Sequence, residues 1–143
     1  MTATPNITVT DWDQARAAAG PVRHQVFVIE QNVPPELEMD DYDAVCRHAL
    51  AFDASGAAIG TGRLLPDGHI GRMAVLSHVR GSGVGSALLE ALLNEACRLE
   101  YPEVVLSAQY HARGFYERHG FQARGDTYQE AGIEHIEMRL PLA

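Results

Sequence analysis

The chain has 143 residues, 46% of them hydrophobic, which is enough for one domain with a buried core and too few for two such domains. Its eleven basic residues, all arginine, stand against nineteen acidic ones, so the formal charge of −8 argues against unaided binding to nucleic acid or an anionic membrane and favours cationic partners. The first residues lack the basic and apolar regions of a signal peptide, and no apolar run approaches the ~20 residues of a membrane span. We therefore expect one cytoplasmic domain over residues 1–143.

The first part of the chain predicts one strand followed by helices. Residues 7–10 alternate like a short strand, and a helix pattern begins at Trp12. The pair Gly20-Pro21 is expected to interrupt this helix, since proline lacks the backbone N–H that a helix interior requires. A second helix is predicted over residues 22–30, with one apolar face formed by Val22, Val26 and Ile29.

Residues 31–43 form the most acidic stretch of the chain and are predicted to be a loop with a short helix. The stretch contains no basic residue, and it carries five carboxylates: Glu36, Glu38, Asp40, Asp41 and Asp43. A solvated run of charges is one interpretation. The other is that these carboxylates border a binding site and attract an ammonium group by long-range electrostatics.

The rest of the chain predicts an α/β domain. Strand patterns over residues 47–53, 57–65 and 69–75 are separated by turn residues and indicate an antiparallel meander. After them we expect a helix over 83–100, a strand over 103–108, a short helix over 111–119, a strand from 121, a loop over 126–132 and a last strand over 133–140. This order fits a mixed, mainly antiparallel sheet flanked by helices.

The glycine turn, residues 80–85 with the sequence RGSGVG, lies between a predicted strand and a long predicted helix. Glycines let the backbone approach a ligand closely, and the first turn of a helix offers unpaired N–H groups to a diphosphate. A dinucleotide fingerprint fails because Ser86 stands where its third glycine belongs, and a Walker loop fails because the chain has no lysine. The pattern that remains is (Arg or Gln)xxGx(Gly or Ala), formed by Arg80, Gly83 and Gly85.

This pattern resembles the acyl-CoA signature of the GCN5-related N-acetyltransferases (GNAT). A second segment, residues 108–121, is similar to a family motif through Gln109, Ala112, Tyr116 and Gly120-Phe121, with Gln109 where many members have asparagine. Further resemblance narrows the match to the bacterial branch called ElaA-like or YjcF-like, and it rests on VFVIEQNVP at 26–34, the spacing of Asp40, Asp43 and His48, and GIEHIEM at 132–138. Together these resemblances run from about residue 22 to 138.

The resemblance implies the acyl-CoA N-acyltransferase (GNAT) fold and an N-acetyltransferase. The implied reaction moves the acetyl group of acetyl-CoA to a primary amine of a small molecule or an N-terminus by direct attack in a ternary complex. An alternative is a non-catalytic acyl-CoA-binding sensor or accessory module, and a transferase of other acyl groups is a third reading. We expect no metal, since the seven histidines form no HxH or HExxH motif, and a homodimer is one option for the assembly.

The resemblance also implies a coenzyme site. It places a bulge in the strand that ends at Val75, with the amides of Met73 and Val75 turned toward the pantetheine arm or the thioester carbonyl. The residues implied to bind the cofactor are Met73, Ala74, Val75, Arg80, Gly81, Ser82, Gly83, Val84, Gly85, Ser86, Gln109 and Phe115.

The catalytic residues are implied in the same way. Tyr116 matches the family's general acid, because a phenol with a pKa of ~10 can hand a proton to a thiolate at neutral pH. The alternative is a tyrosine whose ring fills the core. The base is left open between ordered water and five side chains: Glu30, Asp43, His48, Glu130 and His135.

Overall fold

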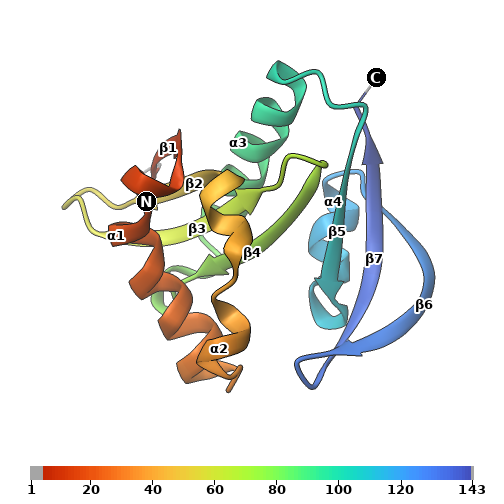
Figure 1. Cartoon of the computed structure of the whole chain (residues 1–143), viewed down its shortest axis with the longest axis horizontal. Helices are drawn as coiled ribbons and strands as arrows, with labels where there is room; N and C mark the ends of the chain where they lie inside the picture. Colours follow the sequence, from red (N-terminus) through yellow and green to blue (C-terminus); the bar gives the residue numbers. More distant parts are fainter. Residues whose placement is uncertain (1–4, 143) are drawn as a thin grey trace.

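The computed structural model describes residues 5–142, which form one seven-stranded sheet flanked by helices (Figure 1). Its strands are β1 Asn6–Thr10, β2 Arg47–Phe52, β3 Ala58–Leu64, β4 His69–Val75, β5 Glu103–Gln109, β6 Gln122–Glu130 and β7 Ile133–Pro141. The helices are α1 Trp12–Arg23, η1 His24–Glu30, α2 Pro35–Glu38, η2 Asp41–Val45, η3 Ser77–Val79, α3 Val84–Arg98, η4 Tyr110–Ala112 and α4 Arg113–Arg118. Within residues 5–142, no helix is long and apolar enough to cross a membrane.

The sheet has the order β1-β2-β3-β4-β5-β7-β6, and only β4 and β5 pair in parallel. The predicted α/β class and the mixed, mainly antiparallel sheet are therefore confirmed. The turn between β2 and β3 forms where the sequence predicted it, because Gly56 adopts a positive φ of 86° and the Asp53 carboxylate accepts hydrogen bonds from the backbone N–H groups of Ser55 and Ala57.

Helix α1 does not end at Gly20-Pro21, so that prediction is wrong. Asp11 caps the helix start by accepting a hydrogen bond from the Gln14 backbone N–H at 3.0 Å, and the helix continues through Pro21 to Arg23. Pro21 and Ala17 both lie on the exposed side of the helix. Water can therefore bond to the Ala17 carbonyl that the proline leaves unpaired.

The segment after α1 is a π-helix, η1, which also changes the predicted apolar face. Val22 and Val26 are buried as expected, but the Ile29 side chain is 56% exposed. The Gln31 N–H bonds to the Val26 carbonyl, five residues back, so side chains in this segment do not follow the 3.6-residue spacing used for the prediction.

Strand β4 contains a bulge opposite β3. Thr61 pairs with Ala74 and Arg63 with Gly71, so β4 has one more residue than β3 between these pairs. Arg72 lies in the extra length with a positive φ of 50°. Gly62 of β3 faces the bulge, where a Cβ would overlap the Met73 sulfur. The bulge expected in this strand is confirmed.

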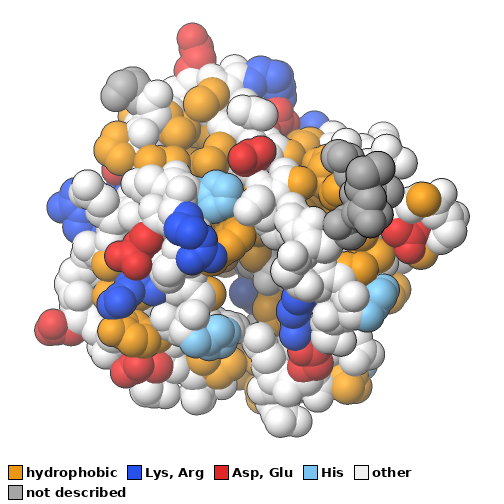
Figure 2. Space-filling model, turned by 180° about the vertical axis from the view of Figure 1, so that it is seen from behind, with side chains coloured by type: hydrophobic (Ala, Val, Ile, Leu, Met, Phe, Trp, Pro, Cys, Tyr) orange, Lys and Arg blue, Asp and Glu red, His pale blue; other side chains and the backbone are white. Residues whose placement is uncertain are grey.

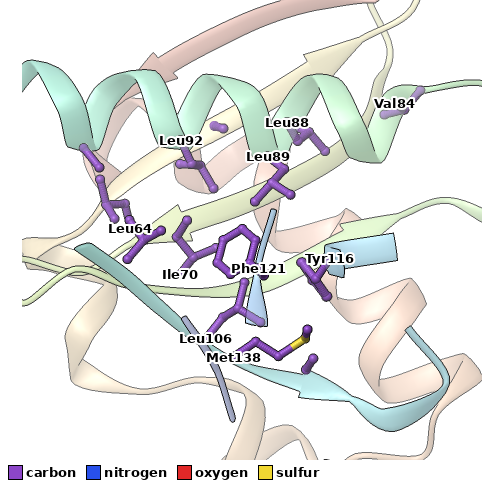
Figure 3. Close-up of a cluster of buried hydrophobic side chains, with 14 of the residues drawn as sticks. Leu64, Ile70, Val84, Leu88, Leu89, Leu92, Leu106, Tyr116, Phe121 and Met138 are labelled. Atoms are coloured by element: carbon purple, nitrogen blue, oxygen red, sulfur yellow. The ribbon is translucent and has the colours of Figure 1, made fainter. Parts of the chain in front are cut away.

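The main core lies between α3 and the sheet (Figure 3). Leu88, Leu89 and Leu92 of α3 point at side chains from the central strands, including Ile70 of β4 and Leu106 of β5. Tyr116 and Phe121 belong to the same cluster, since α4 packs near α3 on this face. A smaller cluster holds α1 to the other face through Ala15, Ala19 and Leu50.

The predicted loop over residues 126–132 is wrong, because β6 continues to Glu130 and only Ala131 and Gly132 form the turn to β7. Both turn residues have a positive φ, of 53° and 77°, as a tight hairpin requires. Every residue of β6 is exposed. This strand lies at the edge of the sheet, so its polar sequence reflects solvent on its side chains rather than a loop.

The two thiols differ in their surroundings. Cys46 is buried, whereas Cys97 is exposed on α3, and both are free. Burial raises the pKa of the Cys46 thiol to about 11. This thiol is therefore neutral at physiological pH.

Candidate active site

A cleft opens where β4 and β5 part. The two strands pair only at His69 with Val105 and at Ile70 with Leu106, and they diverge beyond these pairs (Figure 1). The cleft is lined from both sides of this gap. Among the predicted site residues it is lined by Met73, Gln109, Tyr116, Glu130 and His135. The predicted residues that do not line it are Ala74, Val75, residues 80–86 and Phe115 of the expected coenzyme site, and Glu30, Asp43 and His48 of the expected base.

The end of β4 directs the backbone groups of Val75 away from β3. The Leu76 N–H bonds to the Ile59 carbonyl of β3 at 2.9 Å, so this residue faces β3. Hydrogen-bonding groups alternate between the two sides along a regular strand, so the Val75 N–H points away from β3. The Val75 carbonyl confirms this direction, since it accepts a hydrogen bond from Arg80 Nε at 2.9 Å.

The glycine turn leads into α3 with an open backbone. Gly81 and Gly83 have positive φ values of 82° and 91°, and Gly83 is the N-cap of α3 without a side chain that bonds to the first turn. An added Cβ at either glycine would meet no described atom within 4 Å. The N–H groups of the first helical turn have no partner within the helix and carry a partial positive charge, which suits an anion.

The side chains around the glycine turn serve the fold as well. Val84 is buried in the core, Ser82 donates a hydrogen bond to the Val79 carbonyl, and Ser86 shares one with His119 Nε2 at 2.9 Å. Phe115 lies against Gly85, whose added Cβ would be 3.5 Å from the ring.

Helix α4 lies behind β5 and β7 in Figure 1, and the reverse view in Figure 2 shows Arg and His side chains around a hollow on that face.

Two neighbouring side chains where η1 ends bond to the glycine turn and to the end of β5. The Glu30 carboxylate forms an ion pair with Arg80 at 2.9 Å. The amides of Gln31 and Gln109 bond to each other in both directions, at 3.3 and 2.9 Å. Gln31 therefore connects η1 to the end of β5 across the gap, and Glu30 neutralises the arginine of the glycine turn.

Tyr116 lines the cleft but is only 9% exposed. Burial raises the pKa of its hydroxyl to about 12, and no hydrogen bond to the hydroxyl contributes to this shift. The group is therefore protonated at any physiological pH. Its ring packs edge-on against Phe115 and Phe121, which fixes its position in the core.

His135 presents one ring nitrogen to the cleft. The Nδ1 atom lies 2.7 Å from the Ile133 carbonyl, and because a carbonyl can only accept, Nδ1 carries a hydrogen. In the neutral ring the Nε2 atom is therefore the acceptor, and it lies 3.4 Å from the Glu130 carboxylate. The Tyr128 ring stacks on the imidazole with centroids 6.1 Å apart. A histidine held in this way is suited to accept a proton.

Asp43 and His48 lie outside the cleft and hold the fold together. Asp43 pairs with Arg23 at 2.8 Å and with Arg63 at 2.9 Å. His48 donates from Nε2 to the Asp43 carbonyl at 2.9 Å and packs on Trp12, and burial lowers its pKa. Both side chains are 3% exposed or less.

These pairs belong to an ion network that neutralises much of the acidic stretch. It consists of three carboxylates and three guanidinium groups, from Glu38, Asp40, Asp43, Arg23, Arg63 and Arg72. The three opposite charges cancel. Three of the five acidic residues in 31–43 thus attract arginines of the protein itself, and the stretch does not present its full charge to a ligand.

Sequence reasoning missed Ser107, Tyr128 and Arg72 at this site. The Ser107 hydroxyl bonds to that of Tyr128 and lies 3.4 Å from Glu130. Strand alternation could have identified Ser107, because it lies two residues before Gln109 and shares its face of the sheet. Strand alternation could not have identified Arg72, because its position at the cleft depends on the bulge in β4.

Comparison with known proteins identifies the class that this fold and site define. Residues 18–142 match the model of the acetyltransferase (GNAT) domain. The chain is similar to an acyl-CoA N-acyltransferase from Pseudomonas aeruginosa, with a TM-score of 0.84 and 35% identity, over 95% of this chain and 99% of that one. The chain belongs to the GNAT acetyltransferase family, and its fold is the acyl-CoA N-acyltransferase fold.

Two relatives confirm the branch. The uncharacterized N-acetyltransferase YjcF of Bacillus subtilis is 36% identical over 121 residues, which cover 82% of this chain and 86% of YjcF. The protein ElaA of Escherichia coli is 35% identical over 126 residues, which cover 82% of this chain and 81% of ElaA. The predicted resemblance to this branch is therefore confirmed.

Proposed function

We propose that the protein transfers the acetyl group of acetyl-CoA to a primary amine, on a small molecule or an N-terminus, by direct attack in a ternary complex. The observation that carries the proposal is the parting of β4 and β5, which leaves a cleft lined by Met73 of the bulge together with Tyr116 and His135. Because all these groups border one cavity, a donor and an acceptor can meet there without a covalent enzyme intermediate.

The coenzyme would be held mainly by backbone groups. The open turn at Gly81 and Gly83 and the first turn of α3 suit its diphosphate, since no side chain caps this helix. The N–H groups of Met73 and Val75 would bind the pantetheine arm and the oxygen that gains negative charge. When bound, acetyl-CoA supplies the activated acyl group as a thioester.

The proton transfers fall to two side chains. His135 Nε2 would take the proton that the attacking amine loses as the N–C bond forms, and Glu130 would stabilise the imidazolium. Tyr116 would donate its hydroxyl proton to the sulfur as the C–S bond breaks. The raised pKa of Tyr116 keeps this hydroxyl protonated, so the donor is available throughout the neutral range.

The acceptor would be cationic in solution. Asp67 and Glu130 line the cleft, with side chains 63% and 59% exposed. They are better placed to attract an ammonium group than Asp40 and Asp43, which are already paired with arginines. The ammonium group must first lose one proton to solvent, and His135 then takes the second proton as the N–C bond forms.

The test measures coenzyme binding and thiol release separately. Calorimetry reports the affinity for coenzyme A, and thiol release from acetyl-CoA in the presence of primary amines reports transfer. We expect Tyr116→Phe to lower kcat about 100-fold with little change in coenzyme affinity. Tyr110→Phe is the matched control, because the Tyr110 hydroxyl bonds to Arg113 outside the cleft. Coenzyme binding without thiol release for every amine would support a non-catalytic acyl-CoA-binding module instead.

A further inference from the structure

Large exposed hydrophobic side chains are concentrated in one segment. Of the seven in the described part of the chain, five fall within residues 29–45, and they are Ile29, Leu37, Met39, Tyr42 and Val45. Each is between 54% and 60% exposed. Single exposed apolar residues are ordinary, but exposed apolar residues that line a cleft indicate a surface that contacts an apolar ligand or partner.

Two members of this group, Leu37 of α2 and Tyr42 of η2, line the cleft. Other apolar residues continue the lining toward the gap, among them Phe27, Val33 and Ile133. Helices α1 and α2 lie over the β1 to β4 half of the sheet and leave β5, β7 and β6 uncovered on that face (Figure 1). We call the part of the cleft next to His135 and Glu130 its acceptor end. The side chains of Leu37 and Tyr42 form the apolar wall of this end.

The ion network holds the apolar wall in place. Arg72 of the bulge donates to the Leu37 and Glu38 carbonyls, at 3.2 and 3.1 Å, and the Asp40 carboxylate accepts from the Tyr42 N–H at 3.1 Å. Both apolar side chains therefore project from backbone that is fixed to the sheet. A rigid apolar surface loses little conformational entropy when a ligand covers it.

The charges at this end of the cleft favour one ligand chemistry. The network contributes no net charge, since its carboxylates and guanidinium groups balance. The negative charge that remains belongs to Glu130, beside His135, and to Asp67. A ligand therefore meets local negative charge next to the base and the apolar side chains of Leu37 and Tyr42 across the cleft.

Resting on the proposed function, we infer that the acceptor is a primary amine carried on an apolar body, alkyl or aryl. Its ammonium group binds near Glu130 and His135, and its apolar body covers Leu37 and Tyr42. Amines whose bodies are polar or bear a second charge are poor acceptors, because Leu37 and Tyr42 would cover their polar groups with apolar area.

The experiment compares linear alkylamines from ethylamine to hexylamine. Their affinity for the protein loaded with coenzyme A is measured by calorimetry, and their kcat/KM by thiol release from acetyl-CoA. Each added CH2 that the wall covers is expected to raise both affinity and kcat/KM by up to about fourfold. Pentylamine is compared with 3-methoxypropylamine, which has the same shape with an oxygen in place of one CH2, and we expect pentylamine to be preferred at least tenfold.

Matched variants locate the effect. Leu37→Ser and Tyr42→Ser are expected to flatten the rise in affinity and kcat/KM along the alkylamine series. Met39→Ser and Val45→Ser are the controls and should leave this rise unchanged, since both side chains are equally exposed but lie outside the cleft. A flat series in the unmodified protein, or equal losses in the control variants, overturns the inference even if amines are acetylated. Affinity that rises along the series without thiol release supports this acceptor class and overturns the transfer chemistry.

Discussion

In the proposed coenzyme site the groups offered to a ligand are mostly backbone N–H groups of neighbouring residues, whereas in the proposed acceptor site they are side chains from distant segments. The bulge and the glycine turn lie within residues 72–85. The acceptor side combines Leu37, Tyr42, Glu130 and His135. One side is therefore specified by local backbone conformation, and the other by tertiary packing.

The two sides also differ in what stabilises them. The acceptor wall depends on buried ion pairs, which are worth little net stability but cost much when one partner is removed. The coenzyme side depends on residues with positive φ, namely Gly81, Gly83 and Arg72. For Arg72 this conformation costs roughly 1–2 kcal/mol, and its hydrogen bonds to the acceptor wall offset the cost. Arg72 thereby connects the two sides.

The largest effect is expected for Asp43→Asn. This change removes the carboxylate charge that Arg23 and Arg63 share, so buried positive charge is left uncompensated and the free energy of unfolding should fall by about 3 kcal/mol. Urea unfolding measures this change in the free energy of unfolding. The control is Asp41→Asn in the same short helix, where the exposed side chain predicts a change below about 0.5 kcal/mol. Similar losses in both variants would show that the network does not hold the wall.

The same pairs set a pH dependence. Hydrogen bonds from Arg63 hold the pKa of Asp40 below its ordinary value, and for Asp43 the two arginines outweigh the burial that would raise its pKa. Groups with a lowered pKa in the folded state add stability above the ordinary carboxyl pKa of about 4 and lose it as the pH falls further. Acid unfolding of Asp43→Asn should therefore be less steep than that of the unmodified protein.

The next effect is on catalysis alone. His135→Gln should lower kcat about 100-fold at neutral pH, because glutamine cannot accept the amine proton, while coenzyme affinity is unchanged. His48→Gln is the contrasting variant, since His48 lies outside the cleft, and it should lose stability but keep kcat. If kcat instead falls for His48→Gln and not for His135→Gln, the base has been assigned to the wrong histidine.

A smaller effect is expected at the glycine turn. Gly83→Val and Gly56→Val place the same side chain at nearly the same positive φ, 91° and 86°, with open space around each. Both should lose a similar free energy of unfolding, about 2 kcal/mol. Only Gly83→Val should also weaken coenzyme A binding, by tenfold or more in calorimetry. Unchanged binding in Gly83→Val would remove the diphosphate site from the turn.

The smallest effect is expected for Glu30→Gln. The Glu30 carboxylate pairs with Arg80 beside the glycine turn, so it competes with the coenzyme's phosphates for this guanidinium group. The variant should bind coenzyme A about threefold more tightly at low salt, and the gain should shrink as salt screens the charges. Glu36→Gln serves as the control. Weaker binding by Glu30→Gln would mean that the pair positions Arg80 for the coenzyme.

The sequence predicted well where structure depends on neighbouring residues. The hairpin at Gly56 and the glycine turn followed from glycine and turn chemistry. Errors arose where an exposed edge or an unusual helix changed the pattern. The strand predicted from residue 121 was ended too early, because residues 126–130 of β6 are polar, and the π-helix turned Ile29 outward. The spacing of Tyr116 placed it in the cleft, but spacing could not separate His135 from His48.

The sequence by itself determined the glycine turn, the order of the elements and the family, because these depend on residue types at fixed short spacings. Only the tertiary structure decided which acidic residues are free to face a ligand, since Asp43 is neutralised by arginines 20 residues away on either side. It likewise decided that His135 faces the cleft while His48 is buried under Trp12. Charge and proton transfer depend on distances across the folded chain, and those distances arise only when the sheet assembles.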